Sequence, residues 1–275
     1  GKSIFGTNLV LIVFCHGTFI SSEDYEYLYN TWILTGQYIL ITPSHFSYTI
    51  LNSDYERDTR NYIQSCLSTI KHPHEFIQGK IRKSSFYIAG HSLGAAISAQ
   101  VVTDLIHSGN VCLGFLAIAP PKTDSIVNAF KRITSVPVLF ITGSKDSVVS
   151  MKDVRLMFDE MSNELKYYGS IEGANHCQFT YPVSCLCQGM ERLGSLFKMN
   201  WNATIPHEMQ MEALKQLSLA FFEFSTRISH FLRDPGMHFT GVASDIVWND
   251  YQIGNEVIQS QMYPTMDSSI ASKTS

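Results

Sequence analysis

Short apolar runs alternate with amphipathic segments along most of the chain. The apolar runs are rich in aliphatic, β-branched or aromatic residues and cover residues 9–14, 38–41, 86–89, 113–118, 137–141 and 165–171. Runs of this kind are typical of strands buried in a parallel sheet. Helical patterns cover residues 21–35, 54–70, 94–107, 123–132, 151–161 and 207–232. The alternation predicts an α/β fold, with a mostly parallel central sheet and helices on both faces.

The ends of several elements carry local signals. Ser21 or Ser22 is a suitable N-cap for the helix at 21–35, and Pro43 and Pro120 stand just after two strands. The periodicity stops after the long helix at 207–232. We therefore predict an α/β domain over 1–234 and a C-terminal extension over 235–275 that is partly packed and ends in a loosely held tail.

Composition narrows the class of protein. Of the 275 residues, 45% are hydrophobic and 16% are charged, which suits a globular domain with a sizeable core. The net charge of −4 includes no basic block, so nucleic-acid binding is disfavoured. No apolar run reaches the ~18 residues that a membrane span requires. We expect a monomer without a transmembrane segment.

The pentapeptide Gly90-His91-Ser92-Leu93-Gly94 is the most informative motif. It follows the strand at 86–89 and leads into the helix at 94–107. This is the strand–turn–helix setting in which G-x-S-x-G forms a nucleophile elbow, with the serine at the tip of a strained turn. Gly90 and Gly94 allow strand and helix to approach closely, because neither carries a Cβ. Ser92 is therefore the candidate nucleophile.

Other reactive residues follow neighbouring strands. Ligands of open α/β sheets bind at the carboxyl ends of the strands, and Asp146 and His176 each stand after an apolar run. A serine needs a base to take its proton, which His176 would supply while Asp146 fixes its tautomer. The backbone N–H groups of Leu93 and Thr18 are the candidate oxyanion hole.

Several other residues compete for these roles. Asp124 is the alternative acid, and Glu172 is nearer to His176 in sequence but is expected to end the strand. His91 is better suited to a pocket wall than to a base. His16 is expected to support the oxyanion loop by hydrogen bonding. The His-rich stretch at 72–75 lacks metal-ligand spacing, and we expect neither a metal nor a cofactor.

Four motifs in order, at 16–19, 90–94, 143–149 and 173–179, resemble the α/β-hydrolase superfamily. The resemblance is greatest to the compact branch of dienelactone hydrolases, cutinase-like and chlorophyllase-like esterases. Two features differ from this branch. Little chain precedes Leu9, so the usual antiparallel first strands have no room and the sheet edge is expected to be truncated. Thr18 also stands where polyester-cleaving relatives usually have an aromatic residue, with Phe19 after it.

The expected activity is that of a serine hydrolase on carboxylic esters, of the carboxylesterase or lipase type. A small-molecule or lipid ester with an apolar part would contact Phe19, His91 and Phe179, with Phe46 and Tyr48 as further candidates. Thioesterase or peptidase chemistry with the same three residues is the alternative. A non-catalytic binding protein on the same scaffold is another, because a fold alone does not prove activity.

The cysteines, a sequon and the N-terminal residues indicate the cellular compartment of the protein. Cys177, Cys185 and Cys187 are close in sequence, so a disulfide from Cys177 to either of the other two is geometrically allowed. Asn202 begins an N-x-T sequon. The chain starts at Gly1 without a signal-like segment, as expected of a processed chain. We favour a secreted protein or one of the secretory-pathway lumen, with a cytoplasmic protein as the alternative.

Overall fold

The structure is a computed structural model that describes residues 9–42, 57–58, 60–65, 68, 81–107, 109–198, 205–233, 251–253 and 256–258. The strands are β1 (Leu9–Cys15), β2 (Tyr38–Ile41), β3 (Ile81–His91), β4 (Val111–Ile118), β5 (Val138–Gly143), β6 (Lys166–Ile171), β7 (Tyr251–Ile253) and β8 (Glu256–Ile258). The α-helices are α1 (Glu26–Ile33), α3 (Leu93–His107), α4 (Asp124–Lys131), α5 (Met151–Glu160), α6 (Cys185–Lys198) and α7 (His207–Arg233), and the 3-10 helices are η1 (Ser22–Tyr25) and η2 (Cys177–Phe179).

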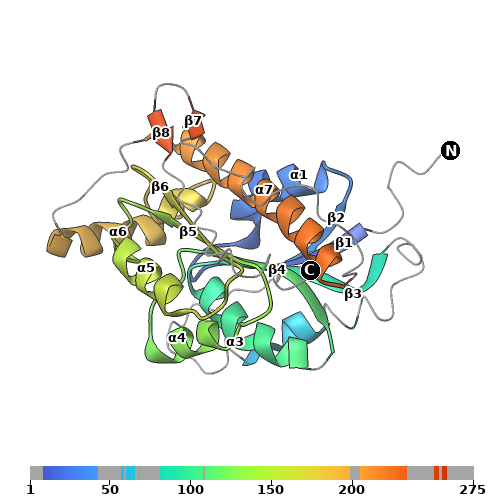
Figure 1. Ribbon diagram of the computed structural model, residues 1–275. Helices are drawn as coiled ribbons and strands as arrows, with labels where there is room; N and C mark the ends of the chain where they lie inside the picture. The colour runs from blue at the N-terminus through green and yellow to red at the C-terminus, as the bar shows by residue number, and fades with distance from the viewer. Residues whose placement is uncertain are drawn as a thin grey trace, which may run out of the picture.

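Six strands form one sheet in the order β2-β1-β3-β4-β5-β6 (Figure 1). Every neighbouring pair in this sheet is parallel. The predicted α/β fold with a parallel sheet is therefore confirmed. Among the described residues, β2 is the edge strand beside β1. Residues 1–8 lie outside the described residues, so the expected truncation of this sheet edge stays a prediction.

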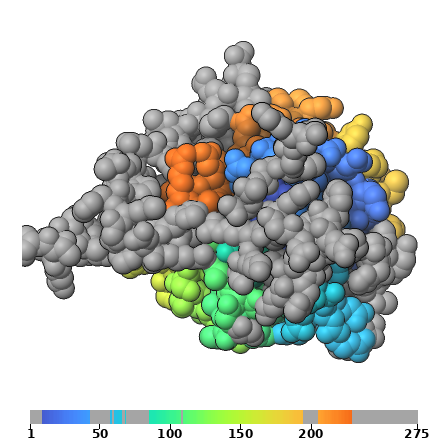
Figure 2. Space-filling model, turned by 90° about the vertical axis from the view of Figure 1, so that its right-hand side faces the viewer, coloured from blue at the N-terminus to red at the C-terminus, as the bar shows by residue number. Residues whose placement is uncertain are grey.

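Helices cover both faces of the sheet. Helices α1 and α7 lie on one face, and α3, α4 and α5 lie on the other (Figure 1). The view turned by 90° again separates the blue and orange atoms of α1 and α7 from the green atoms of α3 and α4 (Figure 2). The Trp32 indole N–H of α1 donates to the Ser218 hydroxyl of α7 over 2.8 Å, which joins the two helices of the first face.

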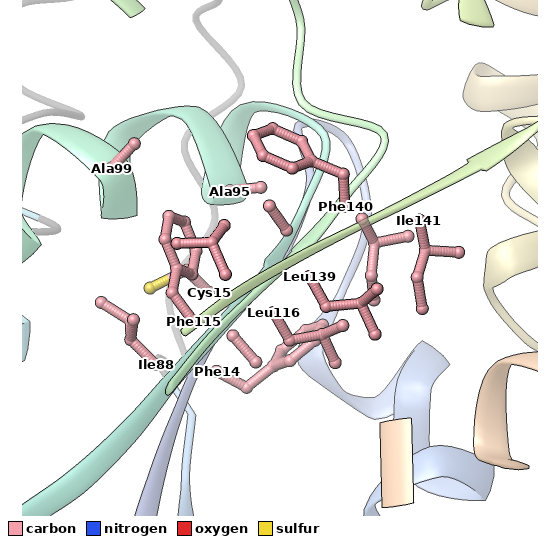
Figure 3. Close-up of a cluster of buried hydrophobic side chains, with 14 of the residues drawn as sticks. Phe14, Cys15, Ile88, Ala95, Ala99, Phe115, Leu116, Leu139, Phe140 and Ile141 are labelled. Carbon is pink, nitrogen blue, oxygen red and sulfur yellow. The ribbon is translucent and has the colours of Figure 1, made fainter. Parts of the chain in front are cut away.

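Aromatic side chains form the core on each face of the sheet. Phe14 of β1 packs against Trp32 of α1, with ring centroids 6.0 Å apart. On the opposite face, Phe140 of β5 packs against Phe130 of α4 at 4.7 Å. Figure 3 shows Ala95 of α3 on the same side of the strands as Phe140. Burial of each large apolar side chain contributes about 1.5–3 kcal/mol, so this core fixes the sheet that carries the site.

Several elements differ from the predicted pattern. The segment predicted as one helix at 21–35 starts as η1, which Ser21 caps, and continues as α1. Strand β3 starts at Ile81, earlier than predicted, and α6 was not predicted. The described residues of the predicted helix at 54–70 are helical.

The C-terminal part is described only at β7 and β8, which pair antiparallel. The rest of the predicted extension at 235–275, including its tail, lies outside the described residues. The division of the chain at residue 234 therefore stays a prediction. Among the described helices, none is both long and apolar enough to cross a membrane.

Candidate active site

Ser92 occupies the turn between β3 and α3 in a conformation that few residues adopt. Its φ of 54° lies in the left-handed region, which costs a non-glycine residue about 1–2 kcal/mol. The surrounding backbone holds it there. Its N–H donates to the Ile118 carbonyl over 2.8 Å, and its carbonyl accepts the Ala95 N–H over 3.1 Å. The turn thus has the strained geometry expected of a nucleophile elbow.

Two glycines make this turn sterically feasible. A Cβ on Gly90 would lie 2.7 Å from the Ala95 nitrogen, within the first turn of α3. A Cβ on Gly94 would overlap the carbonyl oxygens of Cys15 and His16 at the end of β1. Because backbone atoms cannot move aside cheaply, only glycine allows α3 to start so close to β1 and β3.

His176 and Asp146 form a buried pair at the neighbouring strand ends. Nδ1 of His176 donates to Oδ2 of Asp146 over 2.7 Å, and both side chains are almost inaccessible to solvent. The second Asp146 oxygen accepts the backbone N–H groups of Val148 (2.9 Å) and Val149 (2.6 Å). Both carboxylate oxygens are therefore hydrogen-bonded, which fixes the carboxylate that orients the imidazole.

The two loops that carry this pair are joined to each other. The Lys145 N–H donates to the Ala174 carbonyl over 2.8 Å, and the Gly173 N–H donates to the Ser144 hydroxyl over 2.8 Å. A Cβ on Gly143 would overlap the Ala174 backbone, so this close approach requires a glycine. The loops after β5 and β6 consequently form one unit that presents Asp146 to His176.

Glu191 of α6 contacts the same unit. Its buried carboxylate accepts the backbone N–H of His176 at Oε1 and that of Cys177 at Oε2, each over 3.1 Å. The Ser147 hydroxyl donates to the Glu191 carbonyl over 2.7 Å. Cys177 is joined to Cys187 of α6 by a disulfide, which selects one of the two pairings allowed by the sequence. Cys185 is exposed and free.

Two buried histidines lie side by side in the site, with ring centroids of His91 and His176 4.7 Å apart. For His176, burial would lower the pKa, but Asp146, through its charge and its hydrogen bond, and Glu191 outweigh burial and raise it. For His91, burial lowers the pKa well below its ordinary value, and the charge of His176 lowers it further. His91 is therefore a neutral imidazole at physiological pH.

The loop after β1 lies against the elbow. A Cβ on Gly17 would be 3.3 Å from the Ser92 Cβ, so the two backbones are close. His16 Nδ1 donates to the Gly17 carbonyl over 2.9 Å, as expected of a residue that supports this loop. For the backbone N–H groups of Thr18 and Leu93, the two candidate oxyanion donors, the structure gives no hydrogen bond to any described residue.

Tyr25 of η1 links this loop to His91. The Tyr25 hydroxyl accepts the Gly17 N–H over 3.2 Å and lies 2.7 Å from Nδ1 of His91. The other ring nitrogen of His91, Nε2, is buried and has no hydrogen-bond partner in the described part of the chain. Because the Gly17 N–H is engaged by Tyr25, Gly17 offers no donor to an oxyanion.

The three candidate pocket residues differ in exposure. Phe19 is half-buried, has a φ of 61°, and accepts the Ser184 hydroxyl at its carbonyl over 3.1 Å. His91 and Phe179 are fully buried and pack edge to face with ring centroids 5.6 Å apart. Because both side chains are inaccessible to solvent, His91 and Phe179 pack within the protein and present no surface to solvent. Phe46 and Tyr48 lie outside the described residues.

The rival candidates lie elsewhere. Asp124 is the exposed first residue of α4, and Glu172 is exposed just after β6, so neither is in the buried pair with His176. Residues 72–75 lie outside the described residues. Among the residues that the structure describes, no group of His, Cys, Asp and Glu side chains could hold a metal ion.

Sequence reasoning missed Glu191 and Tyr25. Both accept backbone N–H groups, which a residue pattern does not reveal, and Tyr25 also contacts His91, which is 66 residues away in sequence. For Glu191, its position four residues after Cys187, on the same side of a helix, was the one signal in the sequence, and it required α6 to be recognised first.

The fold is that of an α/β protein in which a serine at positive φ occupies the turn between a parallel strand and a helix. Residues 11–182 match the family model of the alpha/beta hydrolase family. The chain belongs to this family, which supports a hydrolytic enzyme. No individual curated protein is similar enough to the chain to match it.

Proposed function

We propose that the protein is a serine hydrolase that cleaves carboxylic esters through Ser92, His176 and Asp146. The observation that carries the proposal is the buried hydrogen bond between His176 Nδ1 and Asp146 Oδ2. The centroid of the His176 ring lies 4.7 Å from that of His91, the residue before Ser92 in the strained turn. Because Asp146 accepts the Nδ1 proton, the lone pair of the neutral imidazole lies on Nε2. Nε2 is thus the atom that takes the proton of the Ser92 hydroxyl.

The reaction proceeds in two steps. In the first, the Ser92 oxygen attacks the ester carbonyl, His176 takes the serine proton and gives it to the leaving alcohol, and an acyl-enzyme forms. In the second, His176 takes a proton from water, which attacks the acyl group, and the proton returns to Ser92 as the acid leaves. The N–H groups of Thr18 and Leu93 stabilise the oxyanion of each step, and loss of one such donor typically costs about 10²–10³-fold in rate.

The substrate is proposed to be a small-molecule or lipid ester with an apolar part. Phe19 supports this choice, because it is a half-buried aromatic residue directly after Thr18. Thioesters and peptides are the second candidates, since the same three residues can attack either. A panel of p-nitrophenyl esters, a thioester and a peptide anilide, with the esters graded in acyl length, separates these substrate classes.

The test of the proposal is hydrolysis of a short p-nitrophenyl ester, together with labelling by a fluorophosphonate probe. We expect Ser92→Ala to lose about 10⁶-fold in kcat and all labelling. Ser125→Ala, at an exposed serine of α4, is the matched control and should retain both. A folded wild-type protein without turnover or labelling would overturn the proposal in favour of a binding protein.

The disulfide supports an oxidising compartment, as proposed for a secreted or lumenal protein. Mass spectrometry of peptides from the protein isolated from its native source, after alkylation under non-reducing conditions, should recover Cys177 linked to Cys187. Recovery of both cysteines alkylated would instead favour the cytoplasm. The monomeric state stays a prediction that light scattering can check.

A further inference from the structure

Helix α6 carries a buried carboxylate that the proposed reaction does not use. Glu191 is only 8% exposed, and burial of a charge is costly unless it has partners. Its partners are two backbone N–H groups, one at each carboxylate oxygen. Because each oxygen accepts an N–H, the arrangement suits the ionised carboxylate, which has acceptors at both oxygens and no donor.

These partners are the amides of the candidate base and of the residue after it. The Glu191 carboxylate therefore fixes the peptide plane from which the His176 side chain projects. The backbone carbonyl of Glu191 accepts a hydrogen bond from the Ser147 hydroxyl, and Ser147 follows Asp146 in the chain. A single residue of α6 thus holds the loops of both members of the buried pair.

The disulfide fixes the position of this residue. Cys187 precedes Glu191 by four residues on α6, so both side chains lie on the same side of the helix. Cys177 is therefore bound to α6 twice, through its amide to Glu191 and through its sulfur to Cys187. Opening the disulfide would leave the hydrogen bonds as the direct attachment of this loop to Glu191.

The charges around His176 give Glu191 a second effect. The titratable groups that face His176 are Asp146 after β5, His91 at the end of β3 and Glu191 on α6. His91 is neutral, so the two carboxylates stabilise the imidazolium that forms when His176 takes the serine proton. Burial raises the pKa of the Glu191 carboxyl, Asp146 raises it further, and the two N–H groups oppose this effect.

We propose that Glu191 is a positioning residue that holds His176 through the amides of residues 176 and 177 and stabilises its protonated form, and that the Cys177–Cys187 disulfide keeps Glu191 in place. The inference rests on the proposed hydrolase function.

The first experiment compares Glu191→Gln with wild type. We expect kcat to fall about 10–100-fold. The NH2 group of the glutamine side chain cannot accept a hydrogen bond, so one of the two backbone N–H groups loses its acceptor and His176 is displaced. Amide hydrogen exchange at residues 176 and 177 should rise about tenfold or more. The His176 pKa, followed by NMR of its ring nitrogens, should fall, and the acid limb of kcat/KM should move to lower pH with it.

Two further variants separate charge from position. Glu172→Gln removes the same charge from an exposed site near His176 in sequence, and should change neither the His176 pKa nor the rate. Glu191→Asp keeps the charge but is too short to reach both amides, so kcat should fall while the His176 pKa stays closer to that of wild type. An unchanged rate and unchanged amide exchange in both Glu191 variants would overturn the positioning role.

The disulfide is tested by reduction with a phosphine. Reduction should speed amide exchange at residues 176 and 177 and lower kcat in wild type and in Cys185→Ser, which retains the disulfide. Cys187→Ala should show both changes before reduction and no further change after it. If reduction changes neither the amide exchange at residues 176 and 177 nor kcat in wild type, the disulfide does not help to keep Glu191 in place.

The NMR and exchange measurements need no substrate. If wild type fails to turn over an ester, the proposed function falls, but a lower His176 pKa and faster exchange in Glu191→Gln would still support the contacts of Glu191. If Glu191→Gln does not fold, Glu191→Asp and the reduced wild type carry the test alone.

Discussion

The site consists of two halves that are held by different means. The proposed acid–base half (Asp146, His176 and Glu191) is held by charge and hydrogen bonds, with one buried carboxylate on the His176 ring and another on its backbone N–H. The nucleophile half (Gly17, Gly94, Tyr25, His91 and Ser92) depends more on shape, through glycines at close backbone contacts and a serine at positive φ. Its hydrogen bonds come from neutral groups, among them the Tyr25 hydroxyl and the Ser92 N–H.

The pKa values of His176 and His91 reflect this difference between the two halves. His176 has carboxylates as neighbours, which raise its pKa, whereas His91 has a tyrosine hydroxyl at Nδ1 and a lowered pKa. Two protonated imidazoles with ring centroids 4.7 Å apart would repel each other. The neutral state of His91 therefore lets a positive charge develop on His176 alone, as the proposed role of His176 as general base requires.

Apart from the loss of Ser92 itself, the largest expected effect comes from the acid–base half. Asp146→Asn should lower kcat/KM for a p-nitrophenyl ester about 10⁴-fold, because an amide no longer enforces the tautomer with its proton on Nδ1 or stabilises the imidazolium. Asp124→Asn, on the exposed first turn of α4, is the control and should leave the rate unchanged. Loss of turnover in the control with full turnover in Asp146→Asn would reassign the acid.

In the nucleophile half, a substitution at a close backbone contact should lower the free energy of unfolding. Gly94→Ala places a methyl group against the backbone carbonyls of Cys15 and His16, so we expect a loss of about 3 kcal/mol in the free energy of unfolding. Gly189→Ala is the matched control on α6, where a Cβ meets nothing within 4 Å. The control should gain up to about 1 kcal/mol, because alanine favours a helix interior. Urea unfolding followed by circular dichroism measures both, and equal stabilities would show that the elbow tolerates a side chain.

This contrast also explains which features the sequence could predict. Most strands could be predicted because their buried parts are apolar runs, as in β1, whereas β3 begins with mostly polar residues and its start was missed. The elbow could be predicted because it needs glycines at fixed positions. Helix α6 was not predicted, although its sequence is amphipathic. Its apolar pattern does not mark its buried side, because Leu186 and Leu193 are exposed whereas Cys187 and Glu191 are buried. The choice between Cys185 and Cys187 needed the direction of each side chain on that helix.

The smallest expected effect is a pH dependence of stability that differs in sign between the histidines. The lowered pKa of His91 means that the unfolded state binds more protons just below the ordinary histidine pKa of about 6.5, so stability falls as pH falls through that window. The raised pKa of His176 has the opposite consequence, because the folded state then binds the extra proton. Its stabilising contribution is complete below about pH 6.5 and is lost as pH rises through the raised pKa.

A variant in which one histidine is replaced by a residue that does not titrate shows the sign of that histidine's contribution to the pH dependence of stability. His91→Asn keeps a polar atom near the Tyr25 hydroxyl but does not titrate, so the free energy of unfolding should fall less steeply below pH 6.5 than in wild type. The difference in slope is at most about 1.4 kcal/mol per pH unit for one proton. His107→Asn, at an exposed position on α3, is the control and should follow wild type. Parallel wild-type and His91→Asn curves between pH 5 and 6.5 would mean that His91 binds protons equally in the folded and unfolded states, and the contrast between the two histidines would then fail.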